Sequence, residues 1–437
     1  MLATLRDRPL LWAIPLTILI ALAGTADMIF RDDVRHLYES NADIADILRN
    51  ARQASPSSIP TWWTGVWIEP SSPYYRPLAS LLFYTEAKLF GGAWRPFCIV
   101  SWLMHAGLCV LILVLLRRLC VGPPVARVVP GVLATALFSI PCETTVNGPH
   151  WGNRGIARGL MPYWPGQTDI TCLLMSLLSL ILLDRWLESR RRSALAGAIA
   201  CFIAALLFKE QAVILPLLAA VLVAYRKAPP RLTGLTALIG LAGSGLFLLL
   251  RKALVPQAWG PEFRGLVPAL VKFTAYLCEP AVMAAVNRQG WVIVSAFFIV
   301  ACVAIMVRRP RFIVYAFLGL FVAVFVPPQI MAGNMALPTV MPQAWWLLRV
   351  VWFLVLLLLV WDTRRRAPTL PLLAGVVIVH LPISHVIGPH YYYWPVAWWS
   401  MLTAVILLSV PGALRAAAAR GRGPMLEIDE DPRDREE

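Results

Sequence analysis

The sequence predicts an all-α polytopic membrane protein with about 12 transmembrane helices and with surface helices in its first outer loop. Two observations carry this prediction. The 437-residue chain is 59% hydrophobic and only 14% charged, which makes it too apolar for a soluble protein of this length. Apolar runs of roughly 16 to 22 residues recur between residues 10 and 414, and short polar segments separate them. We therefore expect one polytopic unit rather than several soluble domains.

The basic residues predict how the chain crosses the bilayer. The 39 Lys and Arg residues outnumber the 24 Asp and Glu residues, which gives a formal charge of +15. Most basic residues lie in short clusters between apolar runs, at 6–8, 117–127, 185–192, 226–231, 308–311, 364–366 and from 415 onward. The positive-inside rule places these clusters in the cytoplasm, so both termini should be cytoplasmic and the longer loops should lie outside. Because the charge reports topology, we expect no nucleic acid partner.

The spans follow from this orientation. We expect them at residues 10–26, 96–116, 128–140, 168–187, 193–208, 213–225, 232–250, 291–307, 312–326, 344–361, 370–387 and 396–408. Two further apolar stretches, 77–90 and 266–286, contain charged residues and are predicted to lie along the outer surface. The run 193–225 is too long for one span, and Lys209 and Glu210 interrupt it. We expect the chain to reverse there at the outer face; the alternative, an ion pair at mid-membrane, is energetically costly.

The chain divides into three parts. We expect residues 1–250 to form a transmembrane module with outer loops at 27–76 and 141–167, residues 251–414 to form a variable transmembrane module, and residues 415–437 to form a charged cytoplasmic tail. The first apolar run is followed by small residues at 23–26 and resembles a signal peptide, but we interpret it as an uncleaved anchor. The 8 cysteines are scattered without a CxxC pair, which favours buried thiols over a zinc site or a disulfide framework.

The first outer loop carries charged residues at both of its ends. Asp32 and Asp33 follow the first span closely. An ionised Asp there suits a general base for an acceptor hydroxyl, and the alternative is an exposed acidic turn or a helix cap. At the other end of the loop, Arg76 stands between Tyr75 and Pro77. Its guanidinium suits a phosphate, which it can bind bidentately, and the alternative is an arginine that reaches lipid headgroups.

The second outer loop mixes cations, amides and aromatic rings. It contains Glu143, Asn147, His150, Trp151, Arg154, Arg158, Tyr163 and Trp164, and Gln167 and Asp169 follow at the start of the next span. Aromatic residues also gather near the membrane surface elsewhere, including Tyr391, Tyr392, Tyr393 and Trp394. Such residues either form interfacial belts or stack against a sugar ring. His105 lies inside the second span and is interpreted as a packed, hydrogen-bonded histidine.

Several of these motifs, taken in order, resemble the GT-C superfamily of integral-membrane glycosyltransferases. They are Phe30-x-Asp32-Asp33, Tyr75-Arg76-Pro77-Leu78 followed by Leu89-Phe90-Gly91, Ser101 with His105, Gln167-x-Asp169, Lys209-Glu210 followed by Pro216, and Tyr391 to Pro395. The likeness is nearest to the protein O-mannosyltransferase-like branch and covers most of residues 10–225. It implies a common module of helices and the transfer of a sugar from a polyprenyl-phosphate donor to a protein, glycan or lipid acceptor.

The resemblance also implies roles for individual residues. Asp32 would be the base, with Asp33 as its support or substitute, and Arg76 and Lys209 would lie near the donor phosphate. The departing phosphate is an anion that needs cations, and Arg154 and Arg158 would also supply them. Glu210 would position Lys209 or bind sugar hydroxyls. The remaining candidates for sugar or acceptor contacts are Asp169, Gln167, Tyr75, His150, Trp164 and Tyr393.

We expect neither a cofactor nor a metal, because a lipid-phosphate donor lacks the pyrophosphate of a nucleotide sugar; His150 with Glu143, or His390, are the residues suited to a metal. Three alternatives remain. A transporter or flippase of lipid-linked sugars would place charges at mid-bilayer. An enzyme that joins lipid-linked glycans would have its largest outer loop late in the chain, and a membrane protein without chemistry would need no such charges. The excess of Arg over Lys suggests a bacterial inner membrane with the site facing the periplasm, with the endoplasmic reticulum as the alternative.

Overall fold

The computed structural model describes residues 8–26, 35, 41–70, 74–139, 164–256, 357, 360–361, 363–364, 367–381 and 393–421, and these residues form helices and loops without a strand. The helices are α2 (Leu10–Ala23), α5 (Ala42–Gln53), α6 (Ile59–Thr64), α7 (Pro77–Phe90), α8 (Trp94–Leu119), α9 (Pro124–Ser139), α11 (Gln167–Ser189), α12 (Arg192–Phe208), α13 (Leu215–Tyr225), α14 (Pro230–Leu254), α21 (Thr369–His380) and α22 (Tyr393–Gly421). Short 3-10 helices occupy Pro56–Ser58 (η1), Trp164–Gly166 (η2) and Glu210–Ile214 (η3).

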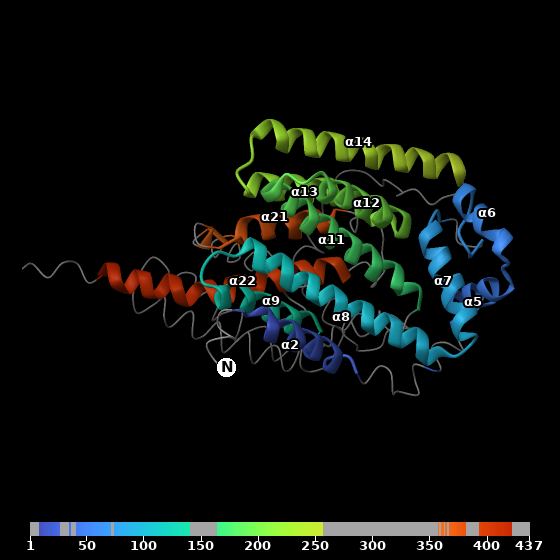
Figure 1. Ribbon diagram of the computed structural model, residues 1–437, viewed down its shortest axis with the longest axis horizontal. Helices are drawn as coiled ribbons and strands as arrows, with labels where there is room; N and C mark the ends of the chain where they lie inside the picture. Colours follow the sequence, from blue (N-terminus) through green and yellow to red (C-terminus); the bar gives the residue numbers. More distant parts are fainter. Residues whose placement is uncertain are drawn as a thin grey trace, which may run out of the picture.

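The apolar helices form a bundle that runs along the long axis of the molecule (Figure 1). Helices α5, α6 and α7 lie together at one end of this bundle, which we call the α7 end. Helices α8, α11 and α13 finish at the opposite end, where α9, α12 and α14 begin. We call this the arginine end because residues 117–127, 184–192 and 226–231 lie there. A hydrogen bond from Tyr225 Oη to the Leu119 carbonyl (2.8 Å) joins two helix ends at this point.

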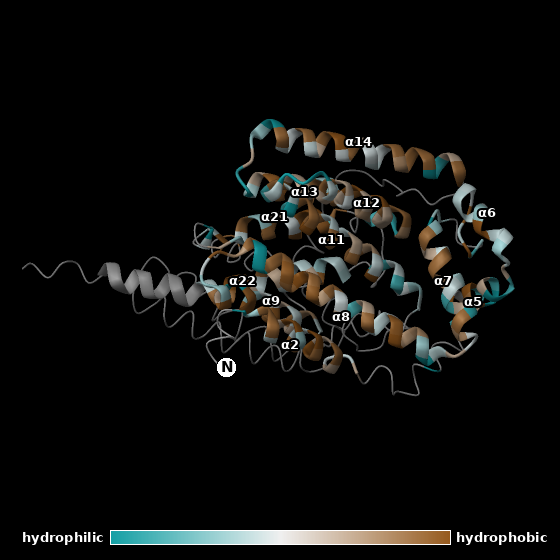
Figure 2. Ribbon diagram, viewed as in Figure 1, coloured by the Kyte–Doolittle hydropathy of each residue, from teal (hydrophilic) through white to brown (hydrophobic). Residues whose placement is uncertain are grey.

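Three helices are long and apolar enough to cross a membrane: Trp94–Leu119, Trp164–Ser189 and Pro230–Leu254. Six shorter apolar helices accompany them among the described residues, and polar residues concentrate near the helix ends (Figure 2). The predicted spans 96–116, 168–187, 193–208, 213–225, 232–250 and 396–408 fall within helices. The spans 10–26 and 370–387 extend past the ends of α2 and α21, and 128–140 extends one residue past the described end of α9. The predicted spans 291–307 and 312–326, most of 344–361, and the surface stretch 266–286 lie outside the described residues.

The predicted reversal at Lys209 and Glu210 is confirmed. Helix α12 packs antiparallel to α11, because Ser179 Oγ donates to the Ala198 carbonyl (2.7 Å) and the Cys172 thiol reaches the Ala205 carbonyl. It ends at Phe208, and Lys209 adopts an extended conformation (φ −160°, ψ 140°). The chain then returns through η3 and α13 to the arginine end. The predicted helix 77–90 is also observed, as α7, with the same bounds.

Close helix packing holds the bundle together. Gly131 of α9 lies so near α8 that a Cβ atom there would meet the Leu113 backbone at 2.6 Å. Leu108, Ile112 and Leu116 of α8 are fully buried in the main core. A second apolar cluster forms beneath the α7 end, where Ile44 and Ile47 of α5 pack with Phe83 of α7. The second cluster also includes Phe97 of α8 and Trp164 of η2, so it holds α5 and α7 against the ends of α8 and α11.

Candidate functional site

Four charged side chains form two ion pairs at the α7 end of the bundle. The Arg76 guanidinium binds Glu210 bidentately, with Nε donating to Oε2 (3.1 Å) and Nη2 donating to Oε1 (2.6 Å). The Lys209 ammonium donates to Asp169 Oδ1 at 2.6 Å. Because Lys209 and Glu210 are adjacent, the two pairs share one turn of the chain. We call these four residues the charge quartet.

Different helix ends supply the members of the charge quartet. Arg76 stands at the start of α7, where Pro77 fits the first helical position because its missing N–H is not needed there. Asp169 is in the first turn of α11, and the charged turn 209–210 follows the end of α12. Charged groups are tolerated at such ends because the helix interiors can remain apolar. The sequence distance between the partners is 134 residues for one pair and 40 for the other.

Aromatic rings hold the Arg76 guanidinium in place. Its Cζ atom lies 3.9 Å from the centre of the Tyr74 ring and 5.4 Å from that of Trp67. The Arg76 side chain is only 6% exposed, so it does not reach outward to lipid headgroups in this arrangement. Stacking and bidentate pairing together define one orientation of the guanidinium plane.

Exposure differs sharply within the charge quartet. The side chains of Lys209 and Asp169 are each 2% exposed, whereas that of Glu210 is 22% exposed. A buried pair of opposite charges is costly to separate, because either charge left alone lacks both water and a partner. Glu210 is therefore the member that a ligand can reach first, and Lys209 with Asp169 forms the deeper, fixed pair. A third cation, Arg251 of α14, acts electrostatically on Glu210.

A second polar group lies beside the charge quartet and includes two predicted site residues. The Trp164 indole Nε1 donates to Glu86 Oε2 at 2.5 Å, and Gln167 Nε2 donates to Ser101 Oγ at 3.0 Å. The Trp164 ring lies 4.4 Å from the Phe97 ring and 4.9 Å from the Phe83 ring, centre to centre. A sugar could stack on Trp164 only if these neighbours moved.

Burial changes the acidity of Glu86, which lies on α7 outside the predicted spans. Its side chain is 4% exposed, and burial raises the pKa of Glu86 to about 7, although hydrogen bonds from Trp164 and Gln167 lower it. The sequence analysis did not single out this residue. The available signal was a carboxylate within an otherwise apolar helical stretch, which we interpreted as a surface position.

Tyr75 and Tyr393 both occupy buried positions. Tyr75 Oη donates to the Trp63 carbonyl (3.2 Å), and its ring packs against Phe247 of α14. Tyr393 Oη is 2.7 Å from His105 Nδ1, and His105 Nε2 is 3.0 Å from Ser139 Oγ. The interpretation of His105 as a packed, hydrogen-bonded histidine is therefore confirmed. Tyr393 fixes the start of α22 against α8 in this arrangement.

Several predicted site residues lie outside the described part of the chain. These are the candidate bases Asp32 and Asp33, the candidate phosphate ligands Arg154 and Arg158, and His150. Among the described residues, no three or more His, Cys, Asp or Glu side chains gather in a way that could hold a metal ion.

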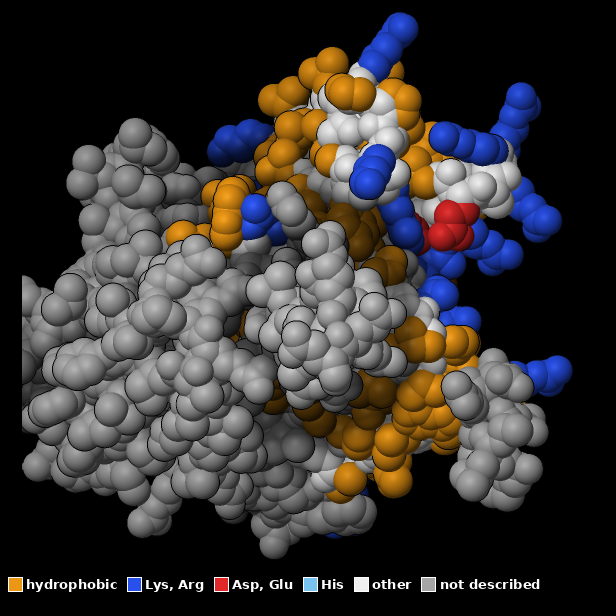
Figure 3. Space-filling view, turned by 90° about the vertical axis from the view of Figure 1, so that its left-hand side faces the viewer, with side chains coloured by type: hydrophobic (Ala, Val, Ile, Leu, Met, Phe, Trp, Pro, Cys, Tyr) orange, Lys and Arg blue, Asp and Glu red, His pale blue; other side chains and the backbone are white. Residues whose placement is uncertain are grey.

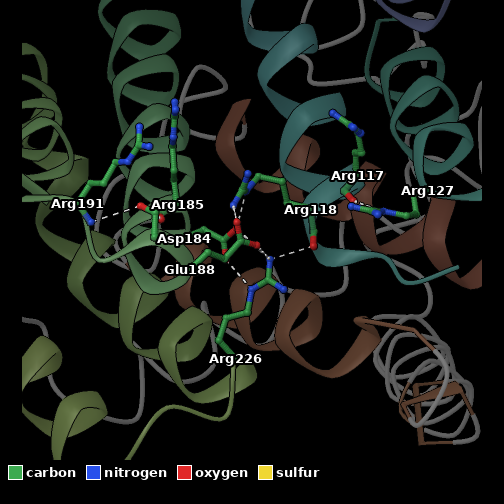
Figure 4. A network of polar contacts seen from close by, with 9 residues as sticks. Arg117, Arg118, Arg127, Asp184, Arg185, Glu188, Arg191 and Arg226 are labelled. Carbon is green, nitrogen blue, oxygen red and sulfur yellow. Dashed lines mark hydrogen bonds and ion pairs between the residues drawn. The ribbon is translucent and has the colours of Figure 1, made fainter. Parts of the chain in front are cut away.

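The arginine end holds a charge network that the sequence analysis did not predict (Figure 4). Asp184 is fully buried and accepts hydrogen bonds from Arg118 Nε (2.5 Å) and from Arg226 Nε and Nη2 (2.5 and 2.9 Å). Glu188, one helical turn further along α11, accepts from Arg118 Nη2 at 2.5 Å. Arg226 also donates to the Arg118 carbonyl (2.9 Å), so the network joins the ends of α8, α11 and α13. The sequence feature that could have indicated this network is Asp184, a single acidic residue near the end of the predicted span 168–187.

The geometry of the charge quartet allows a specific kind of chemistry. Two cations are held in fixed positions by two carboxylates, and one carboxylate is accessible. An incoming anion such as a phosphate would meet the Arg76 guanidinium beside Glu210, the most exposed member of the charge quartet. Comparisons with known proteins give no family: no family model, curated protein or solved structure matches this chain.

Proposed function

We propose that this chain is a multi-pass membrane glycosyltransferase that transfers a sugar from a polyprenyl-phosphate donor to an acceptor hydroxyl at the α7 end. The observation that carries the proposal is the charge quartet, in which Arg76 and Lys209 are fixed at helix ends beside an accessible carboxylate. The resemblance of the sequence motifs to GT-C enzymes supports it, because Arg76, Asp169, Lys209 and Glu210 all belong to those motifs and lie together. The proposed setting is a bacterial inner membrane, with the α7 end facing the periplasm.

The proposed reaction is a single displacement. The acceptor hydroxyl oxygen forms a bond to the anomeric carbon while the bond from that carbon to the phosphate oxygen breaks, so the configuration inverts. The hydroxyl proton passes to a carboxylate, for which Asp32 is the candidate and Asp33 the substitute. The bonding electrons leave with the lipid phosphate, whose added negative charge Arg76 and Lys209 would stabilise. Glu210 would keep the guanidinium oriented and bind sugar hydroxyls.

The pairing within the charge quartet refines these roles. Lys209 donates to Asp169, so Asp169 acts as its positioning residue, whereas Glu210 accepts from Arg76. A phosphate that approaches Arg76 meets Glu210 as well, and repulsion between the two anions would push the carboxylate toward the sugar hydroxyls. This exchange places the donor without exposing an unpaired buried cation.

The test is transfer of radiolabelled sugar from polyprenyl-phosphate donors in membranes that contain the wild type, Asp32→Asn or Arg76→Gln. We expect each variant to lose transfer by at least about a hundredfold. The matched control is Asp184→Asn, which also disturbs a buried ion pair but at the arginine end, so it should melt at a lower temperature and still transfer sugar. Equal transfer by the wild type and both site variants would refute the assigned roles. No transfer with any donor would refute the enzyme and make a flippase of lipid-linked sugars the next reading to test.

A further inference from the structure

The strongest concentration of unbalanced charge lies at the arginine end. Residues 117–127, 184–192 and 226–231 contain ten basic side chains and two acidic ones, a net charge of +8. The two acidic residues, Asp184 and Glu188, are both bound to Arg118 and Arg226. Figure 3 looks onto this end: among the residues drawn in colour, most Lys and Arg side chains lie in the upper right of the view, and acidic side chains are seen there in one place.

Ion pairs with Asp184 and Glu188 hold two of these basic residues, Arg118 and Arg226, in fixed positions. Asp184 is fully buried, whereas Arg118 and Arg226 are 22% and 25% exposed. Each guanidinium uses its Nε and one Nη atom on carboxylates, which leaves the other Nη group without a carboxylate partner among these contacts. The two arginines are therefore held in place, and the second Nη group of each remains able to donate hydrogen bonds to a ligand.

Backbone conformation gives a second, independent observation. Arg190 and Lys227 are the non-glycine residues with positive φ (56° and 54°) in the described part of the chain, and both follow the ends of helices at the arginine end. Glycine or asparagine is preferred at such positions, because other side chains are strained there. Both positions nevertheless carry a basic side chain. The chain therefore has two basic residues at this end in a strained backbone conformation.

The basic residues 190–192, which follow α11, are placed where a membrane surface would be expected. Helix α11 has 23 residues and is therefore about 34 Å long, close to the thickness of the apolar core of a bilayer. Its far end carries Arg190, whose guanidinium lies 5.3 Å from the centre of the Trp186 ring one turn back. At the boundary between lipid tails and headgroups, tryptophan usually lies nearer the tails and arginine nearer the headgroups, which is the order of Trp186 and Arg190 along α11.

We infer that the arginine end is a binding surface for anionic phospholipid headgroups, in which the turn 190–192, with Lys227, supplies exposed cations around the fixed pair Arg118 and Arg226. The phosphodiester of the lipid would accept hydrogen bonds from the guanidinium groups while its acyl chains pack on the apolar helix flanks. A membrane is favoured over a soluble polyanion, because the basic residues lie at the ends of helices that are long and apolar enough to cross one. This inference does not depend on the proposed glycosyltransferase activity.

The experiment measures lipid binding by the full-length protein in a nonionic detergent. Phosphatidylglycerol or phosphatidylcholine is added at equal concentration, bound lipid is counted by native mass spectrometry, and the melting temperature is recorded. We expect phosphatidylglycerol to bind more tightly by at least about tenfold and to raise the melting temperature, with both effects shrinking as salt increases.

Two variants locate the binding. Arg190→Gln, Arg191→Gln and Arg192→Gln together should lower the affinity for phosphatidylglycerol by at least about tenfold. Arg190→Gly with Lys227→Gly should also weaken it, although this variant should melt at the same or a higher temperature without lipid, because glycine relieves the positive φ. The matched control is Arg49→Gln, Arg52→Gln and Arg95→Gln, which removes three cations from the opposite end and should leave lipid binding unchanged.

Three results would overturn the inference. The first is equal affinity for the two lipids. The second is loss of phosphatidylglycerol binding in the control variant but not in the two arginine-end variants. The third is tighter binding of a short RNA than of phosphatidylglycerol under the same salt, which would identify the surface as a nucleic acid site.

Discussion

Individual charged residues at the α7 end are stable only as pairs. Lys209 and Asp169 are almost fully buried and 2.6 Å apart. Removal of one partner leaves the other charge without water or a counter-ion, which typically costs about 3–5 kcal/mol, whereas apolar replacement of both is often close to neutral. This asymmetry makes the Lys209 and Asp169 pair testable as a unit.

We expect Lys209→Met and Asp169→Leu each to lower the stability of the detergent-solubilised protein by about 3–5 kcal/mol. The double variant should lose less than either single variant, since no unpaired charge remains. Thermal melting of the four proteins completes the double-mutant cycle. Additive losses in the double variant would mean that the two side chains act independently and that the ion pair contributes nothing specific.

Glu86 makes stability depend on pH. Its folded-state pKa of about 7 lies above the ordinary value of 4.5, so the folded protein holds this proton more tightly than the unfolded chain does. The resulting stabilisation is fully present below pH 4.5 and is lost as the pH rises through 7, by up to about 3 kcal/mol. Glu86→Gln should remove this component, because the neutral amide does not titrate.

The measurement for Glu86 is the difference in melting temperature between wild type and variant at pH 5 and at pH 8. The wild type should lose a few degrees more than Glu86→Gln over this interval. The control is Asp46→Asn on α5, whose side chain is 37% exposed and which should follow the wild type. Parallel pH curves for wild type and Glu86→Gln would show that the carboxyl is not buried as described.

At the scale of single elements, the close crossing of α8 and α9 depends on one glycine. A Cβ atom at Gly131 would meet the Leu113 Cα and Cδ1 atoms at 2.6 Å, and a backbone atom cannot move aside as a flexible side chain can. We expect Gly131→Ala to lower stability by about 1–3 kcal/mol through overpacking. Thermal melting in detergent measures the effect.

The matched control for this prediction is Gly234→Ala in α14. No atom lies within 4 Å of the position of its Cβ, so alanine meets no obstacle there. Alanine is the better helix former by about 1 kcal/mol, and the variant should be at least as stable as the wild type. If both alanine variants were stabilised equally, the helices would cross further apart than described.

The elements themselves were largely predictable from the sequence, and their contacts were not. Apolar runs separated by basic clusters predicted α2, α8 and α14, and the charged residues at 209–210 predicted the end of α12. The partner of Lys209 was less evident: adjacency in sequence suggested Glu210, whereas the structure gives Asp169. Pairing across 40 and 134 residues depends on helix packing, which a hydropathy pattern does not encode.

The whole molecule has two chemically distinct ends, and α11 connects them. Asp169 lies near the start of this helix and Asp184 is 15 residues further on, so about 22 Å separate the two carboxylates along the axis. The segment between them has no charged residue. The α7 end holds paired, mostly neutralised charges, whereas the arginine end carries a large positive excess. Such an asymmetry fixes orientation in a membrane, because basic residues are retained on the cytoplasmic side.

We therefore expect the arginine end to face the cytoplasm, which cysteine labelling in intact cells can measure. Ser57→Cys lies in η1 at the α7 end, and Ser193→Cys lies at the start of α12 at the arginine end, and both positions are exposed. A membrane-impermeant maleimide should label the variant at position 57 in intact cells and the one at position 193 only after permeabilisation. Unmodified protein measures the background from the native cysteines, of which Cys98, Cys109, Cys120 and Cys172 are buried and Cys201 is partly exposed. The reverse pattern would move the charge quartet to the cytoplasm, where an outward-facing transferase could not use it.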